Sequence, residues 1–247
     1  TDGAFTYLGT VRISINFGGA NHYSGLSATV TYPYTGKTWT VTGYSNSTAT
    51  VDLSDAFTAE TFPGVDSPAA QRTFRVKAEY EGETLEKDFV FNVRPRNAFA
   101  DQRNFTFSPE ASTYSGDIPD VTLVNIGTQY GDKTLVAGKD YTVENPSGNN
   151  MIGWKEFLFT GIGNYSGSLE YPIRIVPTTE IPDIRMEADA VHYDGTAKEP
   201  GVIVNFNGKT VDTVDYELSY SDNVEVGTAT VTITGRRNFS YETTRTF

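Results

Sequence analysis

The clearest alternation of apolar and polar residues in this chain lies around residue 230. Ala229, Val231 and Ile233 occupy one phase, and the threonines between them occupy the other. Strict period-2 alternation with β-branched residues predicts a half-buried strand. Residues 235–238 then supply glycine and asparagine, which favour a turn. We therefore expect Val231 and Ile233 to point into a core and the chain to reverse direction after them.

The same pattern occurs 74 residues earlier, which indicates an internal repeat. Four residues of the turn recur at this spacing: Gly161, Asn164, Tyr165 and Ser166 in the first copy, and Gly235, Asn238, Phe239 and Ser240 in the second. We interpret each asparagine as a turn residue placed before an inward-pointing aromatic side chain. In the strand before the first turn, Phe157 and Phe159 take the phase that we assign to the core.

Residues 1–97 contain six short alternating runs rather than one long pattern. Their inward positions are predicted at Val11, Ile13, Ile15 and Phe17; Ala28, Val30 and Tyr32; Trp39 and Val41; Ala49, Val51 and Leu53; Phe74, Val76, Ala78 and Tyr80; and Phe89, Phe91 and Val93. Short strands with turn residues between them predict a β-sandwich or barrel. Residues 54–72 show no clear period, so we expect a loop that is functional, mobile or contains a short helix.

Proline-containing stretches at residues 94–97 and 177–182 interrupt the alternation, and we interpret them as linkers. We therefore predict three domains: residues 1–97, the N-terminal segment; residues 98–177, the first repeat; and residues 178–247, the second repeat. The expected fold class is all-β, with three consecutive small β-sandwiches in an extended array, no parallel sheet and no core shared between the repeats. A β-grasp fold with one helix is the alternative for the two repeats.

Several motifs of the second repeat follow one another in an order that most of them keep in the first repeat. They are Tyr193-Asp194-Gly195, Pro200, Asp215-Tyr216, residues 227–235, and Asn238-Phe239-Ser240. In this order they resemble the tandem immunoglobulin-like repeats of Gram-positive bacterial cell-surface and secreted proteins, over about residues 104–247. The first repeat departs from the pattern at Trp154, Phe157 and Phe159. The resemblance implies immunoglobulin-like sandwiches that work outside the cell, at the cell surface or cell wall.

A second and shorter set of motifs lies in the N-terminal segment. Residues 24–31 include a Ser-Ala-Thr-Val run, residues 36–41 begin with Gly-Lys-Thr-Trp, and residues 49–53 form a further strand pattern. This combination resembles bacterial prealbumin-like sandwich domains, in which a Gly-Ala-Thr-Val-like strand precedes a Gly-Lys-Thr-aromatic hairpin. The resemblance implies a hairpin around residues 36–41.

Composition narrows the chemistry and the partners that the chain can have. The net charge of −12 argues against a nucleic-acid partner, and an acidic surface discourages self-association, so we expect a monomer. The lack of cysteine excludes disulfides and thiolate metal sites, and no apolar run approaches the roughly 18 residues of a membrane span. The expected ligand is a host or cell-surface glycan or protein, which the sequence does not identify.

Residues with catalytic or metal-binding potential do not converge in the sequence. His22 and His192 lie in different predicted domains without a nearby second ligand. The Asp-Tyr pairs at residues 140–141 and 215–216 occur in both repeats, so we interpret them as structural residues at the start of a strand. Four acidic residues near the second linker lack the spacing of a calcium-binding loop: Asp183, Glu187, Asp189 and Asp194. We assign no catalytic, cofactor-binding or metal-binding residue, and expect no enzyme activity.

Four aromatic residues of the N-terminal segment could form a platform on which a sugar ring stacks: Tyr32, Tyr34, Trp39 and Tyr44. The alternation places Tyr32 and Trp39 in the core as readily as on such a platform. Both interpretations therefore stay open for these two residues.

These observations predict a non-catalytic extracellular module, namely a stalk or adhesion segment of a bacterial surface protein. The alternative is a carbohydrate-binding or accessory module of a larger secreted glycoside-active enzyme. In the 74-residue register Phe247 corresponds to Ile173, and the three residues that follow Ile173 have no counterpart in the second repeat. We expect the closing strand of the second repeat to be truncated and the natural sequence to continue.

Overall fold

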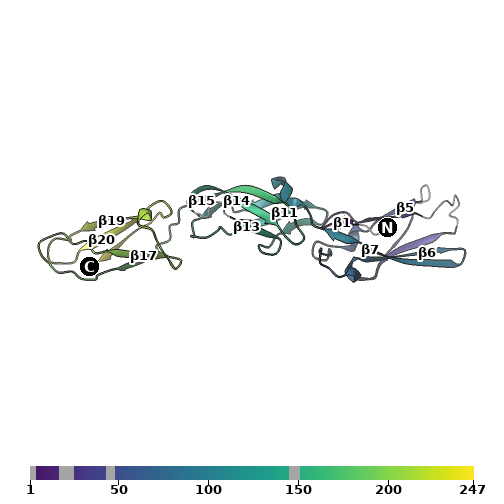
Figure 1. The fold of residues 1–247 in the computed structure, drawn as a ribbon, viewed down its shortest axis with the longest axis horizontal. Coiled ribbons are helices and arrows are strands. Elements are labelled where there is room, and N and C mark those ends of the chain that lie inside the picture. Colours follow the sequence, from purple (N-terminus) through teal and green to yellow (C-terminus); the bar gives the residue numbers. More distant parts are fainter. Residues whose placement is uncertain (1–3, 17–24, 43–47, 145–150) are drawn as a thin grey trace. The chain divides into compact units, whose positions relative to one another are not determined.

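The computed structural model describes residues 4–16, 25–42, 48–144 and 151–247 (Figure 1). The described residues form 21 β-strands and five short 3-10 helices, and they contain no α-helix. This confirms the all-β fold class. The β-grasp alternative requires a helix, which these residues do not supply.

Strands of the N-terminal segment form a four-stranded sheet with the order β4-β3-β6-β7 and two-stranded sheets β2-β5 and β1-β8. Their bounds are β1 Ala4–Thr6, β2 Arg12–Asn16, β3 Ser27–Tyr32, β4 Lys37–Thr40, β5 Thr48–Asp52, β6 Thr73–Tyr80, β7 Glu83–Val90 and β8 Asn92–Arg94. Strands β3 and β4 make the predicted hairpin, in which Tyr32 pairs with Lys37 and Gly36 takes a positive φ. The inward phase is confirmed at Val30, Val51 and Phe74, which are buried.

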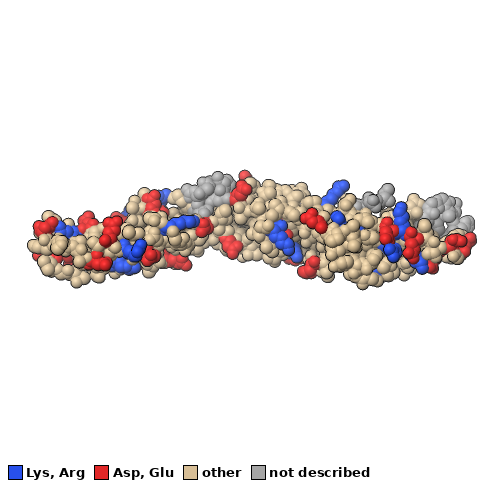
Figure 2. Space-filling view, turned by 60° about the horizontal axis from the view of Figure 1, so that its bottom comes forward, with Lys and Arg blue, Asp and Glu red and all other residues tan. Residues whose placement is uncertain are grey.

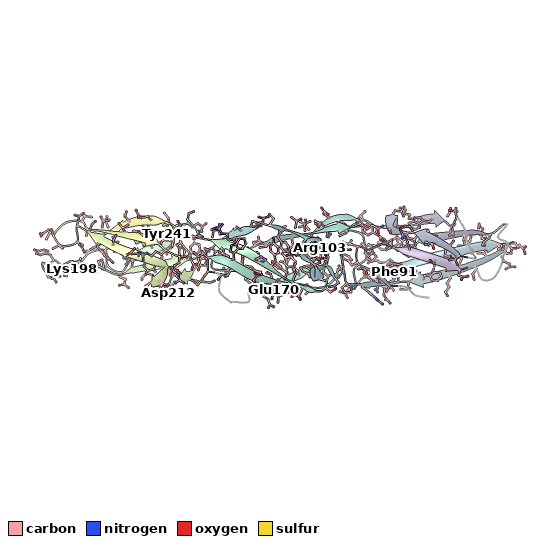
Figure 3. The ribbon with its side chains drawn as sticks, turned by 90° about the horizontal axis from the view of Figure 1, so that it is seen from above. Phe91, Arg103, Glu170, Lys198, Asp212 and Tyr241 are labelled. Carbon is pink, nitrogen blue, oxygen red and sulfur yellow. The ribbon has the colours of Figure 1, made fainter. Side chains whose placement is uncertain are left out.

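One strand of the N-terminal segment differs from its prediction. The sequence pattern joined Phe89, Phe91 and Val93 in one closing strand, but the strand breaks at Phe91 (labelled in Figure 3). Strand β7 pairs with β6 before the break, and β8 pairs with β1 after it. The ring of Phe91 packs between Phe5 and Phe74, with ring centroids 5.0 and 5.4 Å away. The chain therefore changes sheets while it keeps the same side facing the core.

The aperiodic loop of residues 54–72 begins and ends with short 3-10 helices, Ser54–Ala56 and Ala69–Arg72. The prediction that it contains a short helix is therefore confirmed in the 3-10 form. Phe57 and Phe62 of this loop are buried, and their rings lie 5.0 Å apart.

The first repeat contains a four-stranded sheet with the order β10-β15-β14-β13 and a three-stranded sheet with the order β12-β11-β9. The bounds are β9 Phe105–Ser108, β10 Ala111–Thr113, β11 Thr122–Thr128, β12 Gly131–Thr134, β13 Tyr141–Glu144, β14 Gly153–Gly161 and β15 Ser168–Val176, with 3-10 helices at Ala98–Ala100 and Gln102–Asn104. Phe157 and Phe159 are fully buried, as the period-2 pattern predicts.

The second repeat contains two three-stranded sheets, β16-β17-β18 and β19-β20-β21. The bounds are β16 Asp183–Met186, β17 Val202–Phe206, β18 Lys209–Thr210, β19 Tyr216–Ser221, β20 Thr230–Gly235 and β21 Glu242–Thr246, with a 3-10 helix at Thr213–Asp215. Val231 and Ile233 have no exposed surface and lie in one core cluster with Phe206, Phe239 and Tyr241, which confirms the predicted phase. Tyr114 of the first repeat packs against this cluster, so the expectation of an unshared core is wrong at that side chain.

The expectation of sheets without parallel pairing is wrong at two places. Strand β1 pairs in parallel with β8, and β10 pairs in parallel with β15. In each pair an early strand lies beside a late strand of the same predicted domain. Because the two strands are parallel, the early strand ends at the same end of the sheet as the late strand. The residues after the early strand therefore lie beside the linker to the next predicted domain.

The chain folds into two compact units. The first consists of Thr1–Thr106, Leu123–Thr142 and Phe159–Leu169, and the second of Phe107–Thr122, Val143–Leu158 and Glu170–Phe247. The limits of the units fall inside the first repeat, whereas each sheet takes its strands from one predicted domain. The domain limits near residues 97 and 177 therefore remain a prediction.

Candidate functional site: two repeated joints

A set of contacts around Pro95, which we call the first joint, lies within the first unit. Its backbone hydrogen bonds run from Tyr7 N–H to the Arg94 carbonyl (2.9 Å), from Arg96 N–H to the Asn164 carbonyl (2.8 Å) and from Ser166 N–H to the Arg96 carbonyl (2.9 Å). Proline has a fixed φ and no N–H to donate. The residue before Pro95 therefore bonds to the N-terminal segment, and the residue after it bonds to the turn of the first repeat.

The same contacts recur around Pro177 within the second unit, and we call them the second joint. Here the hydrogen bonds run from Tyr114 N–H to the Val176 carbonyl (2.9 Å), from Thr178 N–H to the Asn238 carbonyl (3.0 Å) and from Ser240 N–H to the Thr178 carbonyl (2.7 Å). The two joints therefore share one backbone design, with Tyr7, Pro95 and Asn164 in the places of Tyr114, Pro177 and Asn238.

Both joints depend on the turn that the sequence repeat marked. The N–H of Gly161 donates to the Gly167 carbonyl (3.0 Å), and the N–H of Gly235 donates to the Tyr241 carbonyl (2.8 Å). A Cβ atom on Gly161 would lie 2.8 Å from the backbone nitrogen of Ser166, and one on Gly235 would lie 2.8 Å from the Cβ of Phe239. Distances below 3.0 Å leave no room for a side chain, which explains why glycine occupies both positions.

The asparagine of each turn binds a segment of the preceding predicted domain. The backbone N–H of Val65 donates to Asn164 Oδ1 at 2.8 Å, and the backbone N–H of Ile152 donates to Asn238 Oδ1 at 3.1 Å. Val65 and Ile152 lie outside the strands, so their amides have no ladder partner in a sheet, and each part-buried amide finds its acceptor in the asparagine. The repeated asparagine is thus a connection to the preceding loop as well as a turn residue.

An aromatic pair completes each joint. The rings of Tyr7 and Tyr165 lie 5.5 Å apart at 82°, and those of Tyr114 and Phe239 lie 5.4 Å apart at 76°. Such edge-to-face pairs contribute about 0.5–1.5 kcal/mol beyond the burial of their area. Tyr165 and Phe239 are buried, which confirms that the residue after the asparagine points inward.

The repeated Asp-Tyr pairs support these turns, in agreement with their structural interpretation. The carbonyl of Asp140 accepts from Ile162 N–H at 3.0 Å, and that of Asp215 accepts from Arg236 N–H at 2.7 Å. In the second repeat the Asn238 side-chain nitrogen also donates to Asp215 Oδ2 at 3.2 Å. These buried aspartates therefore hold the turn in place.

Burial raises the pKa of the tyrosines that line the joints. Desolvation is the main cause for Tyr7, whose pKa is raised further by Asp140 and Glu60 and lowered by a hydrogen bond with Asn164. Desolvation also raises the pKa of Tyr165 and Tyr114, and it raises that of Tyr130 to about 12. All four tyrosines are therefore neutral at physiological pH.

Sequence analysis missed Tyr7, Val65 and Ile152 as members of the joints. Tyr7 begins the run Tyr7-Leu8-Gly9, which has the Tyr-x-Gly form of the repeat motif at Tyr114, but the same form occurs at Tyr23, Tyr34 and Tyr80, so the motif alone does not single out Tyr7. Val65 lies in the aperiodic loop, where no pattern marks an amide that binds a distant turn.

Of the four predicted platform residues the structure describes three, and the rings of Tyr32 and Tyr34 lie 5.9 Å apart. Tyr32 is 2% exposed and donates its hydroxyl proton to the Gln71 carbonyl, so it belongs to the core. Tyr34 is 59% exposed. Trp39 is half-buried, and its indole N–H donates to Asp55 Oδ1 at 2.7 Å. Tyr44 lies outside the described residues, as does His22.

Among the described residues, acidic and histidine side chains form no candidate metal centre. The described part of the chain contains no group of three or more His, Asp or Glu residues placed to hold a metal ion. On the face shown in Figure 2, acidic and basic side chains are interspersed among other residues. Among the described residues, none of the helices has the length and apolar character needed to cross a membrane.

Comparisons with known proteins give no family. No family model matches the chain, and neither does any curated protein. Among solved structures, eight N-terminal Ig domains of Down Syndrome Cell Adhesion Molecule isoform 1.30.30 align at TM-score 0.34 and 9% identity, over 98% of this chain and 39% of that one. Dpr2 Ig1-Ig2 in complex with DIP-Theta Ig1-Ig3 aligns at TM-score 0.28 and 6% identity, over 100% and 95% of the chains. At such TM-scores these likenesses carry no argument about this chain, and the fold rests on the strand pairing above.

Proposed function

We propose that this chain is a non-catalytic extracellular segment, a stalk or adhesion segment of a bacterial surface protein with immunoglobulin-like sandwiches. Its functional sites are the two joints, which fix each sandwich to the next. The segment works as a monomer at the cell surface or cell wall. It holds at a distance the part that binds a host or cell-surface glycan or protein. No substrate or cofactor is involved in this role.

The observation that supports this proposal is that one joint design occurs twice. A flexible linker would require only a few polar residues between domains. Each linker proline here is instead flanked by backbone hydrogen bonds on both sides, and an asparagine connects the turn to a loop further back. Repeating these contacts is expected of a segment whose function depends on resisting bending.

Distance measurements across each joint test this role. The chain has no cysteine, so pairs of exposed positions can be replaced by cysteine and spin-labelled: Leu85 with Thr134 in the first unit, and Glu156 with Ser219 in the second. We expect a narrow distance distribution for each pair in the wild-type background. Asn164→Ala should broaden only the first distribution and Asn238→Ala only the second. Broad distributions in the unsubstituted background would contradict the stalk.

A carbohydrate-binding module remains the second candidate because of Tyr34. This ring is 59% exposed, and its hydroxyl accepts a hydrogen bond from Gln71 Nε2 at 3.3 Å. An exposed aromatic face with polar neighbours suits the apolar face of a sugar ring. Glycan-array binding that Tyr34→Ala abolishes, with Tyr80→Ala as the matched exposed control, would favour this candidate over the stalk.

A further inference from the structure

Two Tyr-x-Gly motifs of the chain, at Tyr7 and Tyr114, supply the tyrosine that packs against the turn of a joint. Tyr7 is 6% exposed and Tyr114 is half-buried, because each packs against the aromatic residue of a turn. The motif of the second repeat that corresponds to the one at Tyr114 is Tyr193-Asp194-Gly195, 79 residues further on. Tyr193 is 59% exposed, whereas the joint tyrosines Tyr7 and Tyr114 are covered.

The backbone around Tyr193 has the same local form as the backbone around Tyr114. Gly116 and Gly195 both take a positive φ, of 81° and 78°. The side chain of the residue before each glycine accepts a hydrogen bond from the N–H of the residue after it, at 3.3 Å for Ser115 and 3.0 Å for Asp194. The motif at Tyr193 therefore has the local fold of the one at Tyr114 and differs from it in what covers it. The motif at Tyr34 shares this turn form, since Gly36 has a φ of 77° and Lys37 N–H donates to Thr35 Oγ1 at 3.4 Å, so the repeat register and not the turn links Tyr193 to the joints.

A second wall of this surface also matches the second joint. Val226 lies 74 residues after Ile152, whose N–H binds the asparagine of the second joint, and it is 82% exposed. A pocket of about 250 Å³ lies between the two walls and is lined by Val191, Tyr193, Val224, Val226 and Phe247, with Lys198 at its edge. Figure 3 labels Lys198 in the loop that contributes to this end of the second repeat.

We propose that this surface is the receiving half of a third joint, and that it binds the Asn-aromatic-Ser turn of a further sandwich of the same type. The proposal rests on the proposed function. Acidic Asp222 and Glu225 lie in the wall that contains Val226, and they complement a basic turn such as Gly235-Arg236-Arg237-Asn238 of the second repeat. A second copy of this chain is not the occupant, because both of its described turns already bind the loops at Val65 and Ile152.

A fusion protein tests whether this surface binds such a turn. Phe247 corresponds to Ile173, so residues 174–247 are appended directly after Phe247 of the full chain, which adds the linker proline and a second copy of the Asn238 turn. Amide hydrogen exchange of Val226 is then compared with that in the unfused chain. We expect exchange in the fusion to be slower by about tenfold, the effect of one hydrogen bond. Asn238→Ala in the appended copy should remove the protection.

Two controls separate docking from other causes. Tyr193→Ala should release the Val226 amide, whereas Tyr193→Phe keeps the ring and should keep the protection. A short extension with residues 174–178 alone tests continuation of strand β21. Protection of Val226 by this short extension as strong as in the fusion, or no protection in the fusion, would overturn the proposal. The amides of Val65 and Ile152 report on the original joints in the same samples, so fast exchange there would count against the proposed function instead.

Discussion

The two joints have the same backbone contacts but different surroundings. In the first joint the Tyr7 ring also packs against Phe62 at 5.6 Å, and Phe62 packs against Tyr130 at 5.3 Å. In the second joint the Tyr114 ring stacks on Phe206 at 6.1 Å, and a polar contact lies beside it, since Asn207 Nδ2 donates to the Ser115 carbonyl at 3.0 Å. The invariant part of a joint is thus the proline, the glycine and the asparagine. The residues around this shared part differ between the two joints.

The position after the asparagine gives the largest expected effect. Replacing Tyr165 or Phe239 by alanine removes a buried ring from the joint and from a core, which costs about 3–5 kcal/mol of unfolding free energy. Each variant should destabilise its own unit in chemical denaturation.

Tyr165→Phe is the matched control because it copies Phe239. The Tyr165 hydroxyl is buried and has no hydrogen-bond partner among the described residues, so its removal should leave stability unchanged or raise it slightly. A loss below about 1 kcal/mol in the alanine variants would show that these rings do not carry the joints.

Replacing the asparagines distinguishes the joints further. Asn164→Ala removes the acceptor of the Val65 N–H, which should cost about 1–3 kcal/mol. Asn238→Ala should cost more, because it also removes the donor to the buried carboxylate of Asp215. Denaturation of both variants, with hydrogen exchange at Val65 and Ile152, measures this difference. Asn238→Asp should be worse than Asn164→Asp at neutral pH, since it places a second carboxylate beside Asp215. If Asn164→Ala and Asn238→Ala lose the same unfolding free energy, Asp215 does not support the turn.

Much of the fold was predictable from period-2 alternation, whereas the joints were predictable only in part. The buried phase of Phe157, Phe159, Val231 and Ile233 follows from alternation alone, because one face of each strand must be covered. The Asn-aromatic turn was visible because it repeats. Its partner amides were not visible, since a backbone N–H can be used by any residue type and Val65 lies in a loop without a period.

The break at Phe91 shows another limit of the pattern. Alternation continues through the break, because Phe91 and Val93 are both buried, while the strand exchanges its partner from β6 to β1. Side-chain periodicity reports which face is buried, but not which neighbour supplies the hydrogen bonds. The parallel pairs were missed for the same reason.

Alkaline pH should weaken the first joint more than the second. Tyr7, Tyr130 and Tyr165 have pKa values raised by burial, to about 12 for Tyr130, whereas the second joint pairs Tyr114 with a phenylalanine. The folded state keeps these protons to a higher pH than the unfolded state, in which tyrosine titrates near 10. Their contribution is therefore complete below about pH 10 and is lost as the pH rises towards 12.

Thermal unfolding between pH 8 and 12, followed together with tyrosinate absorbance, measures this loss. Tyr130→Phe removes one titrating group without removing its ring, and it should reduce the pH dependence of the first unit. If the second unit loses stability at a lower pH than the first, the difference in tyrosine burial between the joints does not control how they respond to alkaline pH.

The smallest expected effect is that of the ion pair at the rim of the second joint. Lys209 Nζ lies 2.9 Å from Asp117 Oδ1, but the two side chains are 62% and 70% exposed. Such exposed pairs contribute about 0–1 kcal/mol, and about 1 M salt shortens the screening length to roughly 3 Å. A double-mutant cycle with Lys209→Met and Asp117→Asn should therefore give a coupling energy below about 1 kcal/mol that vanishes in salt. Asn238 and Phe239 are themselves uncharged, so the joint itself should persist when the coupling is gone. If instead salt frees the Ile152 amide to exchange, the rim charges hold the second joint, and the two joints would share a backbone pattern but not a mechanism.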